Sequence, residues 1–338
     1  PKKVILDCDP GSDDAIAMML AMKSDAIDLI GVTTVNGNRI VPKTTENALR
    51  VVQFMKSSVP VYRGCEEPII CNEIPGRKPG LPRVTLNDCH GDFLPLPEAE
   101  IRTEKEHAVF YLVKKLMESE GDIYVAAVGP LTNLAMALRI EPKIAGKIKQ
   151  LVIMGGGHCG ANASPAAEFN FYADPEAAKI VMDSAIPKVI LPLDATWRAC
   201  LSEEKCKELA QLGTPEAKVA AALVQKRIDN LKVNDVSEHN YALRHQAGTV
   251  AGAMLYRYDN HMAPIHDALA IAYLINENVV TELADANVDI DIAGGLCDGR
   301  MVADFHNTKK CKAPVTAKVA LNSDAGLFTD MLFAALGK

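Results

Sequence analysis

Short apolar runs alternate with longer stretches of helix-forming residues along most of the chain. Residues 4–6 are such a run and predict a buried strand. Pro-Gly at 10–11 breaks it, and strong helix formers over 15–22 predict a helix that begins near Ser12 or Asp13. Further apolar runs that predict strands lie at 27–35, 59–62, 123–128, 151–154 and 189–193. This alternation is typical of an α/β fold, so we expect a Rossmann-like open, mostly parallel sheet with helices on both faces.

The last third of the chain continues the pattern less regularly. Runs at 287–292, 301–305 and 313–321 predict edge strands, and a final helix is expected over 325–336. We expect one domain over residues 1–338, with a peripheral helical part around 195–260.

Composition and charge narrow the class of protein. The 338 residues are 49% hydrophobic and 23% charged, which is typical of a soluble globular protein. The net charge of −7 argues against a surface for nucleic acid or anionic membrane, and no apolar stretch is long enough to span a bilayer. Nine cysteines without a Cys-x-x-Cys pair favour free thiols in a reducing compartment, so we expect a cytoplasmic protein.

The turn after the first strand is unusually acidic. Asp7, Asp9, Asp13 and Asp14 fall within eight residues. A helix N-terminus favours one or two negative charges by roughly 0.3–1 kcal/mol each, which cannot offset four neighbouring carboxylates. A bound cation resolves the repulsion, and an all-oxygen ligand set favours Ca²⁺ or Mg²⁺. The alternative is an Asp-rich helix cap with solvated neighbours, although capping alone needs only one Asp.

Three segments carry a resemblance to a known family. Residues 7–15 (DCDPGSDDA) resemble the amino-terminal signature of the nucleoside hydrolases, the inosine–uridine preferring nucleoside N-ribohydrolase family. Residues 129–134 (GPLTNL) and 264–270 (PIHDALA) resemble two later fingerprints of that family. The resemblance implies the nucleoside hydrolase fold and Ca²⁺-dependent hydrolysis of the N-glycosidic bond of ribonucleosides, giving free base and ribose in nucleoside salvage.

The resemblance also implies a metal site and a catalytic base. Ca²⁺ would be held by Asp9, Asp14, Asp267 and the main-chain carbonyl of Val128. Because that fourth ligand is backbone, the identity of the side chain at position 128 need not matter. Asp9 would take a proton from the attacking water, with Asp7 supporting it from behind.

A second implied set binds the sugar. Carboxylates and amides suit ribose hydroxyls because together they offer both acceptors and donors. The residues that match the ribose-binding positions of the family are Asp13, Asn38, Asn162, Glu168 and Asn170. Without the resemblance, the local sequence favours a turn residue at Asn38 and a surface residue at Glu168.

Several residues are candidates for the base end of the substrate. His266 matches a histidine that some members use to protonate the leaving base; the alternative is a capping or packing histidine. His90 lies in a long irregular stretch and is expected either near the base or on the surface. Trp197, the one tryptophan, has packing and base stacking as alternatives. The segment 233–260 matches the region that lines the base pocket in the family, but it does not reveal purine or pyrimidine preference.

Two other functions remain open from the sequence. Asp7-x-Asp9 after a strand also resembles the start of Mg²⁺-dependent haloacid-dehalogenase-type phosphatases, although 10–11 and the late Asp267 fit that pattern poorly. A Ca²⁺-dependent nucleoside-binding protein without catalysis is the non-enzyme alternative, against which Asp9 and His266 both argue. By resemblance alone, the chain is expected to form a homodimer or homotetramer around a ribonucleoside substrate, with no nucleic acid or membrane partner.

Overall fold

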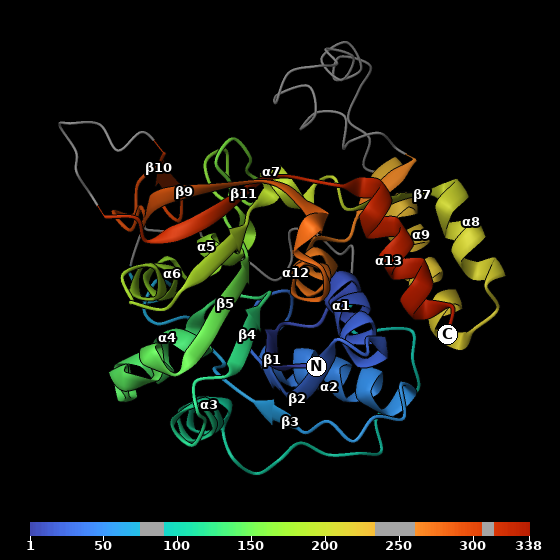
Figure 1. Ribbon diagram of the computed structural model, residues 1–338, viewed down its shortest axis with the longest axis horizontal. Helices are drawn as coiled ribbons and strands as arrows, with labels where there is room; N and C mark the ends of the chain where they lie inside the picture. The colour runs from blue at the N-terminus through green and yellow to red at the C-terminus, as the bar shows by residue number, and fades with distance from the viewer. Residues whose placement is uncertain (75–90, 234–260, 306–313) are drawn as a thin grey trace.

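The computed structural model describes residues 1–74, 91–233, 261–305 and 314–338. Within these ranges its centre is a nine-stranded sheet (Figure 1). The strands are β1 (Lys2–Cys8), β2 (Ile27–Thr34), β3 (Val61–Arg63), β4 (Ile123–Ala127), β5 (Ile148–Met154), β6 (Lys188–Leu191), β9 (Val280–Ile290), β10 (Met301–Asp304) and β11 (Ala317–Ser323). Their order is β10-β9-β11-β6-β5-β4-β1-β2-β3. The pairs from β3 to β11 are parallel, and β9 is antiparallel to both of its neighbours.

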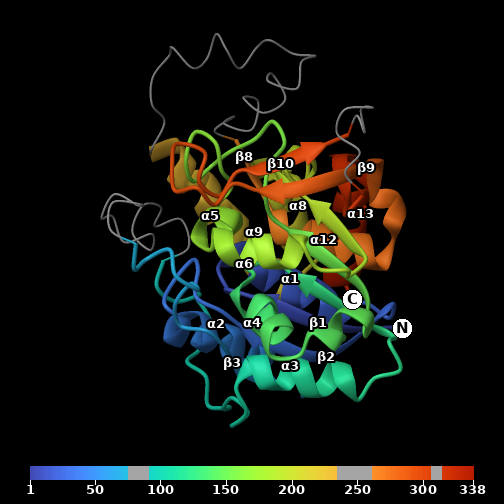
Figure 2. The same cartoon turned by 90° about the vertical axis from the view of Figure 1, so that its left-hand side faces the viewer.

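Helices cover both faces of this sheet, as predicted. One face carries α1 (Ser12–Lys23), α2 (Val41–Phe54), α12 (His266–Ile275) and α13 (Ala325–Leu336). The other carries α3 (Ala108–Met117), α4 (Thr132–Ile140) and α6 (Pro175–Met182), which lie toward the viewer in Figure 2. The central strand β1 contributes to both cores, because Val4 and Leu6 face one and Ile5 the other. This alternation explains the continuous apolar run that predicted the strand.

The predicted elements near both ends of the chain are confirmed. The first helix begins at Ser12, and the last spans Ala325–Leu336. The prediction of edge strands for the last three apolar runs is wrong for two of them. β11 lies between β6 and β9, and only β10 stands at the edge. β11 is an interior strand, and its residues Val319 and Ala320 are buried in opposite cores. An apolar run in the sequence does not by itself distinguish such a strand from an edge strand.

The described residues of the part around 195–260 include two helices and one short strand. α8 (Glu203–Gln211) and α9 (Pro215–Val233) lie beside α13, on the same side of the sheet as α1 (Figure 1). A two-stranded antiparallel sheet of β7 (Cys200–Ser202) and β8 (Met262–Pro264) joins this part to the start of α12. Residues 234–260 lie outside the described residues. Within the described ranges, none of the helices combines the length and hydropathy of a membrane span.

Candidate active site

The candidate site lies at the carboxyl ends of the parallel strands. The chain leaves β1 to form β2 on one side, and later returns to form β4 on the other side of β1. The carboxyl ends of β1 and its two neighbours therefore flank a point where the connections diverge. Crevices at such points are where open α/β sheets bind ligands. The acidic turn 9–14 follows β1 directly at this point.

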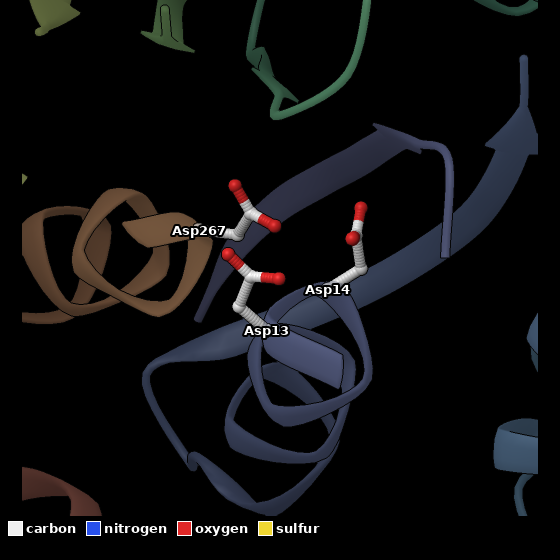
Figure 3. Close-up of side chains that lie close together, drawn as sticks. All are labelled: Asp13, Asp14 and Asp267. Carbon is white, nitrogen blue, oxygen red and sulfur yellow. The ribbon is translucent and has the colours of Figure 1, made fainter. Parts of the chain in front are cut away.

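Three buried carboxylates meet beside this turn. Asp13 and Asp14 come from the first turn of α1, and Asp267 comes from the first turn of α12 (Figure 3). One oxygen of each lies within 4.8 Å of the others. The two helix starts are brought together because α1 and α12 pack side by side in the same apolar core. Residues far apart in sequence thus form one acidic cluster, the cluster of Asp13, Asp14 and Asp267.

Asp14 is oriented by main-chain donors of its own turn. Its Oδ1 accepts from the Asp9 amide at 3.2 Å, and its Oδ2 accepts from the Gly11 amide at 2.9 Å. The second bond is the carboxylate half of a capping box, in which the third helical residue reaches back to the residue that precedes the helix. The local fold of the turn therefore fixes the direction of a cluster carboxylate.

Asp9 lies beside the cluster rather than within it. Its Oδ2 accepts from the Asn38 main-chain amide at 2.6 Å, and the Asn38 side chain donates to the Asp9 carbonyl at 3.1 Å. A Cβ at Gly37 or Gly129 would clash with the Asp9 carboxylate, so these two glycines allow its close approach. The side chain of Asp9 is thereby enclosed between the loops that follow β2 and β4.

Burial and like charge raise the pKa values of this group. Burial first, and then neighbouring carboxylates, raise the pKa of Asp14 from its ordinary value of 3.8 to about 7. The same causes hold the pKa values of Asp9 and Asp267 well above their usual range. The raised pKa values favour protonated carboxyl groups at this site when no cation is bound. Buried oxygen donors of this kind fit a hard divalent cation, which would take the place of those protons.

Asp7 is fully buried near the end of β1 and forms hydrogen bonds with residues of β2 and α4. Its Oδ1 accepts from Thr33 Oγ1 at 2.5 Å and from Asn133 Nδ2 at 2.7 Å. Asn133 also donates to the Thr34 carbonyl and accepts from the Cys65 amide. Burial raises the pKa of Asp7 to about 6. Asp7 and Asn133 therefore fix the ends of β1 and β2 against the start of α4, which supports the loop that carries Asp9.

Two of the predicted sugar-binding residues contact the main chain at the carboxyl ends of β4 and β5. Glu168 precedes α5 (Phe169–Ala173) and accepts from the amides of Gly156 and Asn170 at 2.8 and 2.9 Å. Its burial raises its pKa to about 7. Asn170 Nδ2 donates to the carbonyls of Val128 and Met154 at 2.8 and 3.0 Å. The Val128 carbonyl, a predicted metal ligand, thus carries an amide donor in this structure.

The remaining predicted residues have different surroundings. Asn162 is exposed, and its Oδ1 accepts from the Phe169 amide at 2.8 Å, so it closes the turn before α5. His266 is buried at the start of α12, with Nδ1 2.8 Å from Thr196 Oγ1. Trp197 is 7% exposed and packs in the apolar core near Gly160, which favours packing over base stacking. His90 lies outside the described residues.

Two contributors to the site were missed from the sequence. Arg227 of α9 places Nη1 3.1 Å from Asp13 Oδ2, with both side chains largely buried. Asn47 of α2 donates to the Pro10 carbonyl at 2.9 Å and accepts from the Leu94 amide at 2.9 Å. The surrounding sequence does not predict a role in the site for either residue. An arginine or an asparagine within a helix that also carries polar residues is typical of a solvent-exposed face.

A mostly parallel α/β sheet with buried acidic side chains at the point where its connections diverge defines the class of open α/β proteins that bind ligands at the carboxyl ends of their strands. Residues 4–330 match the family model described as inosine-uridine preferring nucleoside hydrolase. A pyrimidine-specific ribonucleoside hydrolase RihB of Escherichia coli O157:H7 (strain EC4115 / EHEC) is 36% identical over 334 residues, covering 97% of this chain and 94% of the relative.

Solved structures agree with these matches. A plant nucleoside hydrolase, PpNRh1, superposes with a TM-score of 0.80 at 27% identity and covers 99% of each chain. A purine-preferring ribonucleoside hydrolase from Gardnerella vaginalis also gives a TM-score of 0.80, at 25% identity over 99% of this chain and 98% of its own. The chain belongs to the inosine–uridine preferring nucleoside hydrolase family, which is a family of enzymes.

Proposed function

We propose that this enzyme hydrolyses the N-glycosidic bond of ribonucleosides and releases free base and ribose with the help of Ca²⁺. The observation that carries the proposal is the buried cluster of Asp13, Asp14 and Asp267 at the carboxyl end of β1. Its position within the family signature, and the names of relatives that span nearly the whole chain, support the reaction.

The candidate ligands of the cation are Asp14 and Asp267, together with Asp9 and the Val128 carbonyl. When bound, the cation would lower the pKa of a coordinated water and polarise the ribose hydroxyls. A hard cation suits this set because every donor is oxygen, and Ca²⁺ in particular tolerates irregular carboxylate and carbonyl sites. The raised pKa values of Asp9, Asp14 and Asp267 support the same view, because the metal-free site holds more negative charge than it can stabilise.

In the proposed reaction, individual residues have separate roles. Asp9 accepts a proton from the water that attacks the anomeric carbon. The bond to the base breaks through an oxocarbenium-like transition state, as in other glycoside hydrolyses. His266 donates a proton to the departing base. The ribose hydroxyls are bound by Asp13, Asn38, Asn162, Glu168 and Asn170, and His90 is assigned to the base side.

The proposed base preference rests on the names of two relatives. The 36% identical relative is named pyrimidine-specific, whereas the 25% identical structure is named purine-preferring. We therefore assign uridine and cytidine as the better substrates. The proposed role in the cell is nucleoside salvage in the cytoplasm. We also propose that the enzyme is a homodimer or homotetramer, which light scattering of the purified protein tests.

A panel assay tests the proposed function. Free ribose is measured from uridine, cytidine, inosine, adenosine and guanosine, with Ca²⁺ and after thorough chelation. The proposal expects metal-dependent ribose release that is fastest with the pyrimidines. Nucleoside binding by folded, metal-loaded protein without ribose release would favour the binding-protein alternative. Phosphate release from a phosphate ester with Mg²⁺ would favour the phosphatase alternative.

A further inference from the structure

A threonine and the candidate acid are hydrogen-bonded within the core. Thr196 is the last residue of α7 (Leu193–Thr196), the short helix that follows β6. Its Oγ1 lies 2.8 Å from Nδ1 of His266. Thr196 is fully buried and His266 is 9% exposed. A valine would fill the same volume in this apolar core, so the hydroxyl is explained by the bond to the imidazole.

The hydroxyl is held on a rigid frame. The Leu193 amide donates to the Gly156 carbonyl at 3.0 Å, which ties α7 to the loop after β5. Ser323 Oγ donates to the Ala195 carbonyl at 2.8 Å, which ties α7 to the end of β11. On the other side, the Ile265 amide donates to the Ala199 carbonyl at 2.7 Å and fixes the residue before His266. Both partners of the Thr196–His266 bond are therefore positioned by the sheet.

The bond to Thr196 fixes the orientation of the imidazole ring. An imidazole has its two nitrogens on different edges, so a partner at Nδ1 fixes the rotation of the ring and turns Nε2 away from α7. His266 immediately precedes Asp267 of the acidic cluster, which lies in the same first turn of α12. The ring is thus held on the same helical turn that carries a carboxylate of the cluster.

We propose that Thr196 is a positioning residue that presents His266 Nε2 to the departing base. The proposal rests on the proposed function. In the step, the N–H bond at Nε2 breaks and a new N–H bond forms on the base, which keeps the electron pair of the glycosidic bond. Water supplies the hydroxyl to the anomeric carbon and its proton to Asp9. Throughout, Nδ1–H donates to Thr196 Oγ1, so the hydroxyl does not have to reorient.

A double-mutant cycle on nucleoside hydrolysis tests this proposal. The matched pair is Thr196→Val, which removes the hydroxyl at nearly constant volume, and Thr196→Ser, which keeps it. We expect Thr196→Val to lower kcat roughly 10- to 100-fold with little change in KM, because a misplaced acid loses most of its contribution. Thr196→Ser should recover kcat to within roughly threefold of the wild-type enzyme.

The second arm of the cycle uses His266→Phe, in which the ring cannot donate a proton. Adding Thr196→Val to this variant should then cost no further activity, because the residue that Thr196 positions is absent. If His266→Phe does not fold, as judged by urea unfolding, His266→Gln replaces it. Equal fold-losses from Thr196→Val in both backgrounds would overturn the proposal, and so would wild-type kcat in Thr196→Val.

A substrate with a better leaving group provides an independent readout. Nitrophenolate leaves a riboside without protonation, so p-nitrophenyl riboside bypasses the acid. Thr196→Val should hydrolyse it at the wild-type rate while losing activity on uridine; equal losses on both would contradict a role through His266. A wild-type enzyme that released ribose from neither substrate would instead overturn the proposed function, so the two failures are distinguishable.

Discussion

Arg227 Nη1 lies 3.1 Å from Asp13 Oδ2, so a guanidinium from α9 neutralises one carboxylate of the acidic cluster. The side chains are only 13% and 9% exposed, which makes this a largely buried ion pair. Removal of one partner of such a pair leaves a buried charge uncompensated, at a cost of about 3–5 kcal/mol when burial is complete. The guanidinium also opposes a cation bound to the neighbouring carboxylates.

These two effects predict how Arg227→Met changes stability. The metal-free variant should lose roughly 2–4 kcal/mol of unfolding free energy, and the Ca²⁺-loaded variant should lose less, because the cation then compensates Asp13. Urea unfolding with chelator and with Ca²⁺ measures both. Lys226→Met, at an exposed position one residue earlier, is the control. Equal losses with and without Ca²⁺ would mean that the ion pair is independent of the cation.

Asn47 joins the metal turn to a second loop, and its removal should affect both. Asn47→Ala leaves the Pro10 carbonyl and the Leu94 amide without their partner, which should cost roughly 1–3 kcal/mol. Because Pro10 lies between Asp9 and the start of α1, we also expect weaker Ca²⁺ binding in calorimetry. Gln53→Ala is the matched control, since Gln53 binds only the main chain of residues 98–101. Unchanged Ca²⁺ affinity in Asn47→Ala would separate this contact from the metal turn.

The acidic cluster predicts an inverted pH dependence for the metal-free enzyme. A carboxyl whose folded pKa lies above its unfolded pKa keeps its proton after the unfolded chain has lost it. Its contribution to stability is full below the unfolded value and is lost as pH rises toward the folded value. For Asp14 that window runs from 3.8 to about 7, and Asp9 and Asp267 shift in the same direction.

The chelated protein should therefore become less stable between pH 5 and pH 7.5, whereas Ca²⁺ should remove most of the decline. Asp267→Asn removes one charge from the cluster and should flatten the chelated profile. Asp285→Asn, which removes an exposed carboxylate on β9, should leave it unchanged. Urea unfolding at each pH gives the profiles. A chelated protein that gains stability over this range would show that the cluster is not strained by its own charge.

Asp9 and Asp13 should separate into different kinetic roles. Asp9→Asn removes the base and a ligand, so we expect kcat to fall roughly 10²–10⁴-fold together with Ca²⁺ affinity. Asp13→Asn keeps a polar group toward the sugar, so KM should rise several-fold while Ca²⁺ binding persists. Steady-state kinetics and calorimetry on both variants provide the comparison. The opposite pattern would make Asp13 the metal ligand, in line with its place among the three mutually close carboxylates.

The sequence predicts those features that are formed by residues consecutive in the chain. The strand, break and helix of residues 4–22 specify the acidic turn, and the apolar alternation specifies a sheet covered on both faces. Only the family resemblance predicted that Asp267 lies at this turn. The local sequence could not, because the proximity depends on the packing of α1 against α12. Arg227 and Thr196 act across elements distant in sequence, and neither residue type at its position signals a partner. The interior place of β11 likewise follows from sheet order, which an apolar run alone does not specify.

Reactivation of the chelated enzyme by Ca²⁺ tests whether the acidic cluster is part of a catalytic metal site. Protein stripped of metal is titrated with Ca²⁺ while ribose release from uridine is followed, and bound Ca²⁺ is measured in the same samples. We expect negligible ribose release without metal and a rate that rises linearly to a plateau at one Ca²⁺ per chain. Full activity in the stripped protein would contradict it, as would one tightly bound Ca²⁺ without any ribose release.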